Sequence, residues 1–120
     1  MVADITLYNK HYNQTTRLDE WQITYLYGVN WYGGRAVAVT DKGLSTASLY
    51  KIRIYPTAEN QETYNLNYEA GKWRLQNGDV VALGIITTPL PKNITTEHFT
   101  ITMWSDIRFG GLPHWRAEGK

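Results

Sequence analysis

The segment that most constrains the fold covers residues 73–86, where two apolar stretches flank an Asn-Gly pair. Trp73 and Leu75 are two positions apart, so in a strand they point to the same face. Asn77-Gly78 favours a two-residue hairpin turn, because glycine has no Cβ and asparagine tolerates a positive φ angle. Residues 80–86 are almost continuously apolar, as in a strand covered on both sides. These features predict a central β-hairpin.

Several other segments alternate apolar and polar residues with the period of two that is typical of strands. They cover residues 4–12, 21–32, 50–55 and 98–106. In the clearest of them, 21–32, one face is predicted to carry Trp21, Ile23, Tyr25, Tyr27, Val29 and Trp31. Gly33-Gly34 then predicts a hairpin into a further strand at 35–40.

The connecting segments are long and polar. Residues 57–71 are a long excursion in which 59–62 are expected to open a short helix, and 87–97 contain two prolines and are expected to form a loop. We therefore predict an all-β fold, a small antiparallel β-barrel or sandwich of six to seven strands with long loops. Residues 1–107 would form this domain, and 108–120 an extended C-terminal arm.

Composition narrows the class of protein. A chain of 120 residues has room for one domain, and a net charge of +1 without a basic run does not indicate a nucleic-acid-binding protein. There is no cysteine, so disulfides and thiolate metal sites are excluded. No apolar run approaches the roughly 20 residues of a membrane helix, and the first residues lack the pattern of a signal peptide. We expect no membrane association.

Aromatic residues are unusually frequent, with five Trp and nine Tyr against two Phe. Tyr and Trp combine an apolar body with a polar tip, which suits half-buried sheet faces and interfaces. The pattern indicates either a β-rich core or an aromatic surface for a protein partner or a sugar.

Motifs for catalysis or metal binding are weak. The three histidines lack metal-ligand spacing, and there is no phosphate-binding loop and no nucleophile elbow. Asp19-Glu20 resembles half of a glycosidase pair without an identifiable second carboxylate. Asp79 is expected to accept hydrogen bonds from backbone N–H groups of its own turn. We therefore expect no enzyme activity, no cofactor and no metal.

Four motifs in this order resemble a family of small proteins from the head–tail gene modules of tailed phages and prophages of Gram-positive bacteria, described as minor capsid or head–tail joining proteins. They are Asp-Ile-Thr-Leu-Tyr-Asn at 4–9, Gly-Val-Asn-Trp at 28–31, Trp-x-Leu-x-x-Gly-Asp at 73–79 and Arg-Phe-Gly-Gly-x-Pro-His at 108–114. Asp-Lys-Gly-Leu at 41–44 also fits the order, and residues 45–70 match least. The resemblance covers nearly the whole chain.

The resemblance implies a structural role in the phage neck and provides no catalytic residues. A head-closure (stopper) or tail-completion protein forms a homo-oligomeric ring between portal and tail, through a head-to-tail interface that closes by rotation. Its partners would be a portal or adaptor ring on the head side, a tail-terminator ring on the tail side and packaged DNA, bound non-specifically. Such a protein is assembled in the bacterial host cytoplasm and resides in the virion.

The candidate functional residues fall into three groups. The tail is predicted to supply interface residues Arg108, Phe109, Leu112, His114 and Trp115, unless it is simply disordered. The segment 57–68 is predicted to face the lumen or a partner through Glu59, Glu62, Tyr64 and Tyr68. Lys51 and Arg53 share one strand face, which is either a solvated face or part of a DNA channel.

Two alternatives remain open. One is a carbohydrate-binding β-sandwich, in which exposed coplanar rings among Trp21, Tyr25, Tyr27 and Trp31 would stack on sugars. The other is a different virion subunit, such as a capsid-decorating or tail-tube protein.

Overall fold

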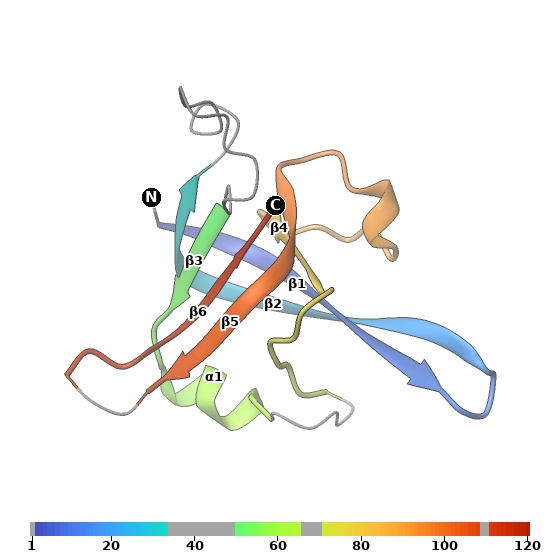
Figure 1. Ribbon diagram of the computed structural model, residues 1–120, viewed down its shortest axis with the longest axis horizontal. Coiled ribbons are helices and arrows are strands. Elements are labelled where there is room, and N and C mark those ends of the chain that lie inside the picture. Colours follow the sequence, from blue (N-terminus) through green and yellow to red (C-terminus); the bar gives the residue numbers. More distant parts are fainter. Residues whose placement is uncertain (1, 34–49, 66–70, 109–110) are drawn as a thin grey trace.

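The chain forms a closed barrel of six antiparallel strands, as seen in a computed structural model that describes residues 2–33, 50–65, 71–108 and 111–120 (Figure 1). The strands are β1 (Val2–Asn13), β2 (Leu18–Gly33), β3 (Tyr50–Ile54), β4 (Val80–Leu83), β5 (His98–Ile107) and β6 (His114–Gly119). They are ordered β1-β2-β3-β6-β5-β4 around the barrel. A short helix, α1 (Ala58–Thr63), follows β3, and a 3-10 helix, η2 (Pro91–Asn93), precedes β5. The all-β prediction is confirmed, with the barrel as its form.

The barrel interior is filled by side chains from all six strands and from residues 73–75. Aromatic rings meet edge to face at its centre: the centroids of Trp73 and Trp115 lie 4.9 Å apart, and those of Trp31 and Phe99 lie 5.5 Å apart. Such pairs contribute about 0.5–1.5 kcal/mol each beyond the area they bury. Much of the aromatic content therefore serves the core.

A β-bulge in β2 changes which side chains face the core. Ala3 pairs with Val29 but Ile5 pairs with Leu26, so β2 contains one more residue than β1 across this step. Gly28 lies in the extra step with a φ of 68°, a conformation that glycine adopts without strain.

The prediction that the alternate residues from Trp21 to Trp31 share one face of the strand is therefore wrong. Val29 and Trp31 face the barrel interior, whereas Trp21 and Ile23 pack in a separate cluster with Tyr8. A bulge of one residue is enough to move every later side chain to the opposite face, because the side-chain period of a strand is two.

The separate cluster lies under residues 84–97, which connect β4 to β5. The Tyr8 hydroxyl donates to the carbonyl of Thr88 at 2.6 Å, and the Thr6 hydroxyl donates to the carbonyl of Gly84 at 2.7 Å. The N–H of Ile86 donates in turn to the Thr6 hydroxyl at 2.8 Å. The predicted proline-containing loop is therefore fixed to the barrel.

The predicted central hairpin at 73–86 is wrong. β4 pairs with β1 and β5, and Trp73 forms only an isolated parallel bridge with Tyr64. The side chain of Asn9 satisfies the backbone of Arg74 at this point. Asn9 Nδ2 donates to the Arg74 carbonyl at 2.7 Å, and the Arg74 N–H donates to Asn9 Oδ1 at 3.2 Å. Gly78 has the expected positive φ, 95°, but its N–H donates across to Ile101 of β5.

The predicted C-terminal arm and the domain boundary at residue 107 are also wrong. β6 lies between β3 and β5 and closes the barrel, with Trp115 and Ala117 fully buried. Alternate residues of β6 face the core, and the strand covers the edges of β3 and β5, which would otherwise be exposed. The predicted Gly33-Gly34 hairpin and the strand at 35–40 lie largely outside the described residues, although β2 and β3 do pair antiparallel, with Gly33 opposite Tyr50.

Candidate functional site

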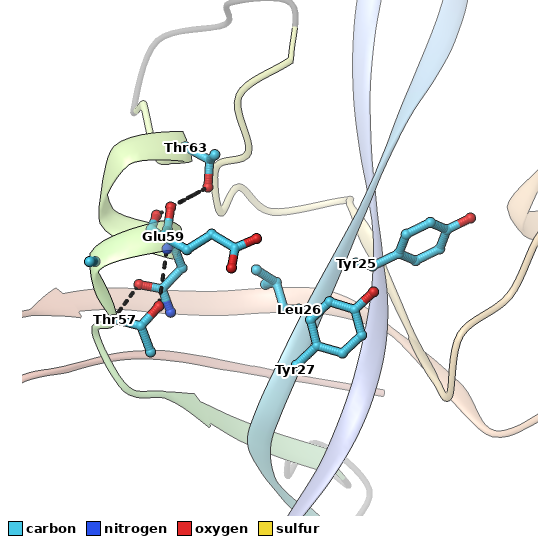
Figure 2. Close-up of a pocket in the computed structure, with 8 residues that line it drawn as sticks. Tyr25, Leu26, Tyr27, Thr57, Glu59 and Thr63 are labelled. Carbon is cyan, nitrogen blue, oxygen red and sulfur yellow. Dashed lines mark hydrogen bonds between the residues drawn. The ribbon is translucent and has the colours of Figure 1, made fainter.

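A pocket of about 380 Å³ lies between β2 and α1 (Figure 2). This volume is within the range of roughly 300–1,000 Å³ that is typical of ligand pockets. Its lining consists of Tyr25, Leu26, Tyr27, Thr57, Ala58, Glu59, Asn60 and Thr63. We call it the β2–α1 pocket.

Capping interactions fix α1 beside the barrel. Thr57 and Asn60 form a capping box: the Thr57 N–H donates to Asn60 Oδ1 at 2.7 Å, and the Asn60 N–H donates to Thr57 Oγ1 at 3.1 Å. Asn60 also donates through Nδ2 to the carbonyl of Tyr55 at 2.9 Å, and its own carbonyl accepts from Trp73 Nε1 at 3.1 Å. These bonds tie α1 to β3 and to the core, and so they hold Glu59 at the pocket.

The pocket combines aromatic surface with one carboxylate. Tyr27 is 62% exposed and Tyr25 is also exposed, whereas Leu26 between them is buried. The carboxylate of Glu59 extends from α1 toward β2, as Figure 2 shows. None of the described lining residues is cationic. A carboxylate beside tyrosine rings suits a cationic group with an apolar stem or a polyhydroxylated ring.

A second cluster at the same end of the barrel contains Arg108. Its guanidinium donates to both carboxylate oxygens of Asp106, each at 2.8 Å, and lies 5.0 Å from the ring centroid of Tyr64 and 4.8 Å from that of Trp115. Hydrogen bonding to Asp106 raises the pKa of Arg108, and burial raises the pKa of Tyr64. The side chain of Arg108, which was predicted to be an interface residue, thus binds groups of its own subunit.

The other predicted tail residues have different environments. Leu112 is exposed, and His114 is half-buried with Nδ1 2.9 Å from the carbonyl of Leu112. Trp115 is fully buried, so its prediction as an interface residue is wrong. Phe109 lies outside the described residues. The interface role of Leu112 and His114 stays a prediction.

The predicted partner loop, 57–68, supplies the α1 side of the pocket, and of its four named residues one lines the pocket. Glu59 lines it, whereas Glu62 is exposed outside it. Tyr64 packs against Trp73, with ring centroids 4.8 Å apart, and Tyr68 lies outside the described residues.

Lys51 and Arg53 share the outer face of β3, as predicted. They flank Tyr32, whose ring centroid lies 5.4 Å from the Lys51 ammonium and 5.8 Å from the Arg53 guanidinium. Neither residue lines the β2–α1 pocket. Their role in a DNA channel stays a prediction.

A buried carboxylate outside the pocket, Asp79, has partners that the sequence did not indicate. Asp79 is fully buried: its Oδ1 accepts from the Lys10 N–H at 3.1 Å and from Gln76 Nε2 at 2.9 Å, and its Oδ2 accepts from Asn9 Nδ2 at 2.7 Å. Burial raises the pKa of the Asp79 carboxyl. The backbone partner is in β1 and not in the turn itself, so the prediction for Asp79 is wrong. The contact joins residues 76–79 to β1.

The sequence predicted only part of this site. Thr57 and Asn60 are spaced as a capping pair, and Tyr25 and Tyr27 were candidate sugar-stacking residues, but no local pattern places them together. Trp31, another candidate for stacking, is buried, and Trp21 is half-buried. Within the described ranges, no group of three or more His, Asp or Glu side chains is arranged to hold a metal ion. No helix in the same ranges is long and apolar enough to span a membrane.

Comparison with known proteins gives one match. A family model described as "Family of unknown function (DUF6751)" matches residues 1–120. No curated protein and no solved structure matches the chain.

Proposed function

The chain belongs to this family of unknown function, and we propose that it is a structural subunit that assembles into a ring in the phage neck, as a head-closure or tail-completion protein. The observation that carries the proposal is a two-stranded ribbon that extends beyond the barrel (Figure 1). The ribbon consists of residues 9–13 of β1, the turn at 14–17 and residues 18–22 of β2. The resemblance to head–tail joining proteins supports a role of this kind in the neck.

The ribbon projects because its strands leave the barrel early. β1 pairs with β4 only over residues 5–8, and β2 pairs with β3 only over residues 30–33. At the base of the ribbon, Asn9, Lys10 and Gln22 still bond to residues 71–79. Farther out the two strands pair with each other, with Lys10 Nζ 3.4 Å from Asp19 Oδ2. An isolated two-stranded hairpin is at best marginally stable in water. A long one is therefore best explained by contacts with another molecule.

Two features make the ribbon suitable for assembly. Tyr12 is 57% exposed and Leu18 is 65% exposed, so large apolar side chains flank the turn. In addition, residues 18–29 of β2 pair with β1 alone among the described strands, which leaves one edge of β2 without a strand partner. An open edge of this kind can pair with a strand of a neighbouring chain.

In the proposed ring, the neighbours of each subunit are other copies of the chain, a portal or adaptor ring and a tail-terminator ring. Lys51 and Arg53 are then candidates to face packaged DNA, since phosphate contacts require only positive charge. The site of action is the neck of the virion. Catalysis is not part of this role.

The test is assembly on phage heads. Light scattering of the purified chain, alone and mixed with portal-loaded heads of the same phage, should show that it joins the heads and that they retain DNA. The paired substitution Tyr12→Ser and Leu18→Ser should abolish joining without changing the circular dichroism spectrum. Val2→Ser, at a residue that is 70% exposed on β1 away from the ribbon, is the matched control. If the unaltered chain binds neither heads nor tails, the neck proposal is refuted.

A second function is favoured by the exposed tyrosines of the β2–α1 pocket. Tyr25, Tyr27 and Glu59 provide ring faces and a hydrogen-bond acceptor for a sugar. Titration with a panel of glycans, followed by intrinsic fluorescence and calorimetry, should then give saturable binding that Tyr27→Ala removes. Absence of binding across the panel would exclude this function.

A further inference from the structure

The β2–α1 pocket carries a negative charge, which favours a cationic ligand. Among the described residues that line it, Glu59 carries the one charged group, and Tyr25 and Tyr27 provide ring faces on the β2 side. A guanidinium fits both parts, because it forms charge-assisted hydrogen bonds with a carboxylate and stacks on aromatic rings.

A guanidinium of this kind lies at the ribbon turn of the same chain. Arg17 is exposed, and none of the ion pairs among the described residues involves it. It is the single described residue other than glycine with a positive φ, 60°. A turn residue in this conformation is usually glycine or asparagine, because a Cβ is unfavourable there. An arginine at a strained position points to a role for its side chain.

Arg17 cannot reach the pocket of its own subunit. Eight residues of β2 separate it from Tyr25, which at about 3.3 Å per residue is roughly 26 Å. In Figure 1 the ribbon extends away from the barrel and from α1. The two surfaces therefore lie at different places on one molecule, as a head-to-tail contact between copies requires.

We propose that the β2–α1 pocket of one subunit binds the ribbon turn of a second copy of this chain, with Arg17 of one copy paired with Glu59 of the next. Leu18 is next to Arg17 in the chain and is exposed, so it provides apolar area beside the ion pair, whereas Tyr12 lies on the opposite face of the ribbon. Each subunit then donates one ribbon and accepts another, and a head-to-tail contact of this kind gives a ring when its rotation closes. The contact rests on the ring proposed above and specifies its interface.

Cross-linking tests the contact directly, since the chain contains no cysteine. Arg17→Cys and Glu59→Cys proteins are mixed, alone and on portal-loaded heads, and treated with a short thiol-reactive cross-linker. We expect a cross-linked dimer from the mixture and a ladder of oligomers when one chain carries both substitutions. Lys92→Cys mixed with Glu59→Cys is the control, because Lys92 is also exposed but lies in η2.

Charge exchange provides a second test. Arg17→Glu and Glu59→Arg should each weaken self-association by about tenfold or more, since like charges then face each other. A chain that carries both exchanges restores opposite charges across the contact and should recover most of the association. Both positions are on the surface, so circular dichroism spectra should not change.

The possible outcomes distinguish failure of the proposed pocket contact from failure of the proposed ring. If the chain oligomerises or joins heads but Arg17→Cys cross-links to Glu59→Cys no better than the Lys92→Cys control does, the pocket contact is refuted and the ring stands. If the chain neither oligomerises nor joins heads, and no cross-link exceeds the control, both are refuted.

Discussion

Replacing Gly119 by alanine should break the contact between β5 and β6. A Cβ at Gly119 would lie 1.8 Å from the carbonyl oxygen of Thr100 and 2.7 Å from Cδ2 of Phe99. The carbonyl is backbone, so no rotamer change relieves the clash, and the two strands must separate by more than an ångström. Thr100 and Lys120 exchange two backbone hydrogen bonds next to this point, at 3.0 and 3.2 Å, and the separation would break them.

The cost follows from these contacts. Two lost hydrogen bonds cost about 0.5–1.5 kcal/mol each, and overpacking costs about 1–3 kcal/mol. The free energy of unfolding should therefore fall by about 2–6 kcal/mol, a large part of the roughly 5–15 kcal/mol of a domain. At about 4 °C per kcal/mol for a chain of this size, the Tm should fall by roughly 8–24 °C.

Thermal unfolding followed by far-UV circular dichroism and tryptophan fluorescence measures this fall. The control is Gly111→Ala, because a Cβ at Gly111 meets nothing within 4 Å. It should change the free energy of unfolding by less than about 0.5 kcal/mol. If Gly119→Ala melts like the control, residues 114–119 are a free arm in solution and not the strand that closes the barrel.

Three further changes test the ribbon turn, the helix cap and the buried carboxylate. Arg17→Gly relieves about 1–2 kcal/mol of backbone strain against roughly 0.5–1 kcal/mol of added chain entropy, so urea denaturation should show equal or slightly higher stability while self-association is lost; a clear loss of stability would contradict this. Thr57→Ala should cost about 1 kcal/mol in the same assay, because the Asn60 N–H loses its acceptor; an unchanged stability would show that the cap is not needed. Asp79 has a raised pKa, so the folded protein holds this proton more tightly than the unfolded chain does. Its contribution to stability is therefore complete below the ordinary value of 3.8 and is lost as the pH rises through the raised pKa. Asn at this position does not titrate, so the stability of the unaltered protein relative to Asp79→Asn should fall as the pH rises from about 4 to 7, and an advantage that grows with pH would contradict the assignment.

The sequence predicted those elements whose signal is local. β1, β3 and β5 follow the alternation of apolar and polar residues, and the start of α1 follows from a polar segment after Pro56. The bulge at Gly28 was missed because alternation continues through it in the sequence, while the curvature of the barrel decides where the register shifts. The glycines and the proline of the tail predict an arm, although Trp115, Ala117 and Gly119 alternate with polar residues as in a strand.

The site was less predictable than the fold, because it depends on contacts between distant segments. Tyr27 and Glu59 are both visible as surface residues, but only the path of the chain after β3 brings α1 beside β2. Asp79 was expected to bond within its turn, since the sequence does not show that Asn9 and Lys10 of β1 lie beside it. Such partners are set by tertiary packing.

The pairing order of the barrel also has a consequence for how fast the protein folds. β1 and β2 are joined by a short turn, whereas β1 must also pair with β4, and β3 with β6, across long stretches of chain. Barrels dominated by non-local strand pairing fold in milliseconds to seconds. The entropy of closing the long loops is lost before the strand contacts that stabilise the barrel can form. The ribbon can therefore form before the barrel closes and exposes its unpaired β2 edge during that interval. Newly made chains are then most prone to associate wrongly before the pocket exists to receive a ribbon, and the rate of barrel closure sets how long that period lasts.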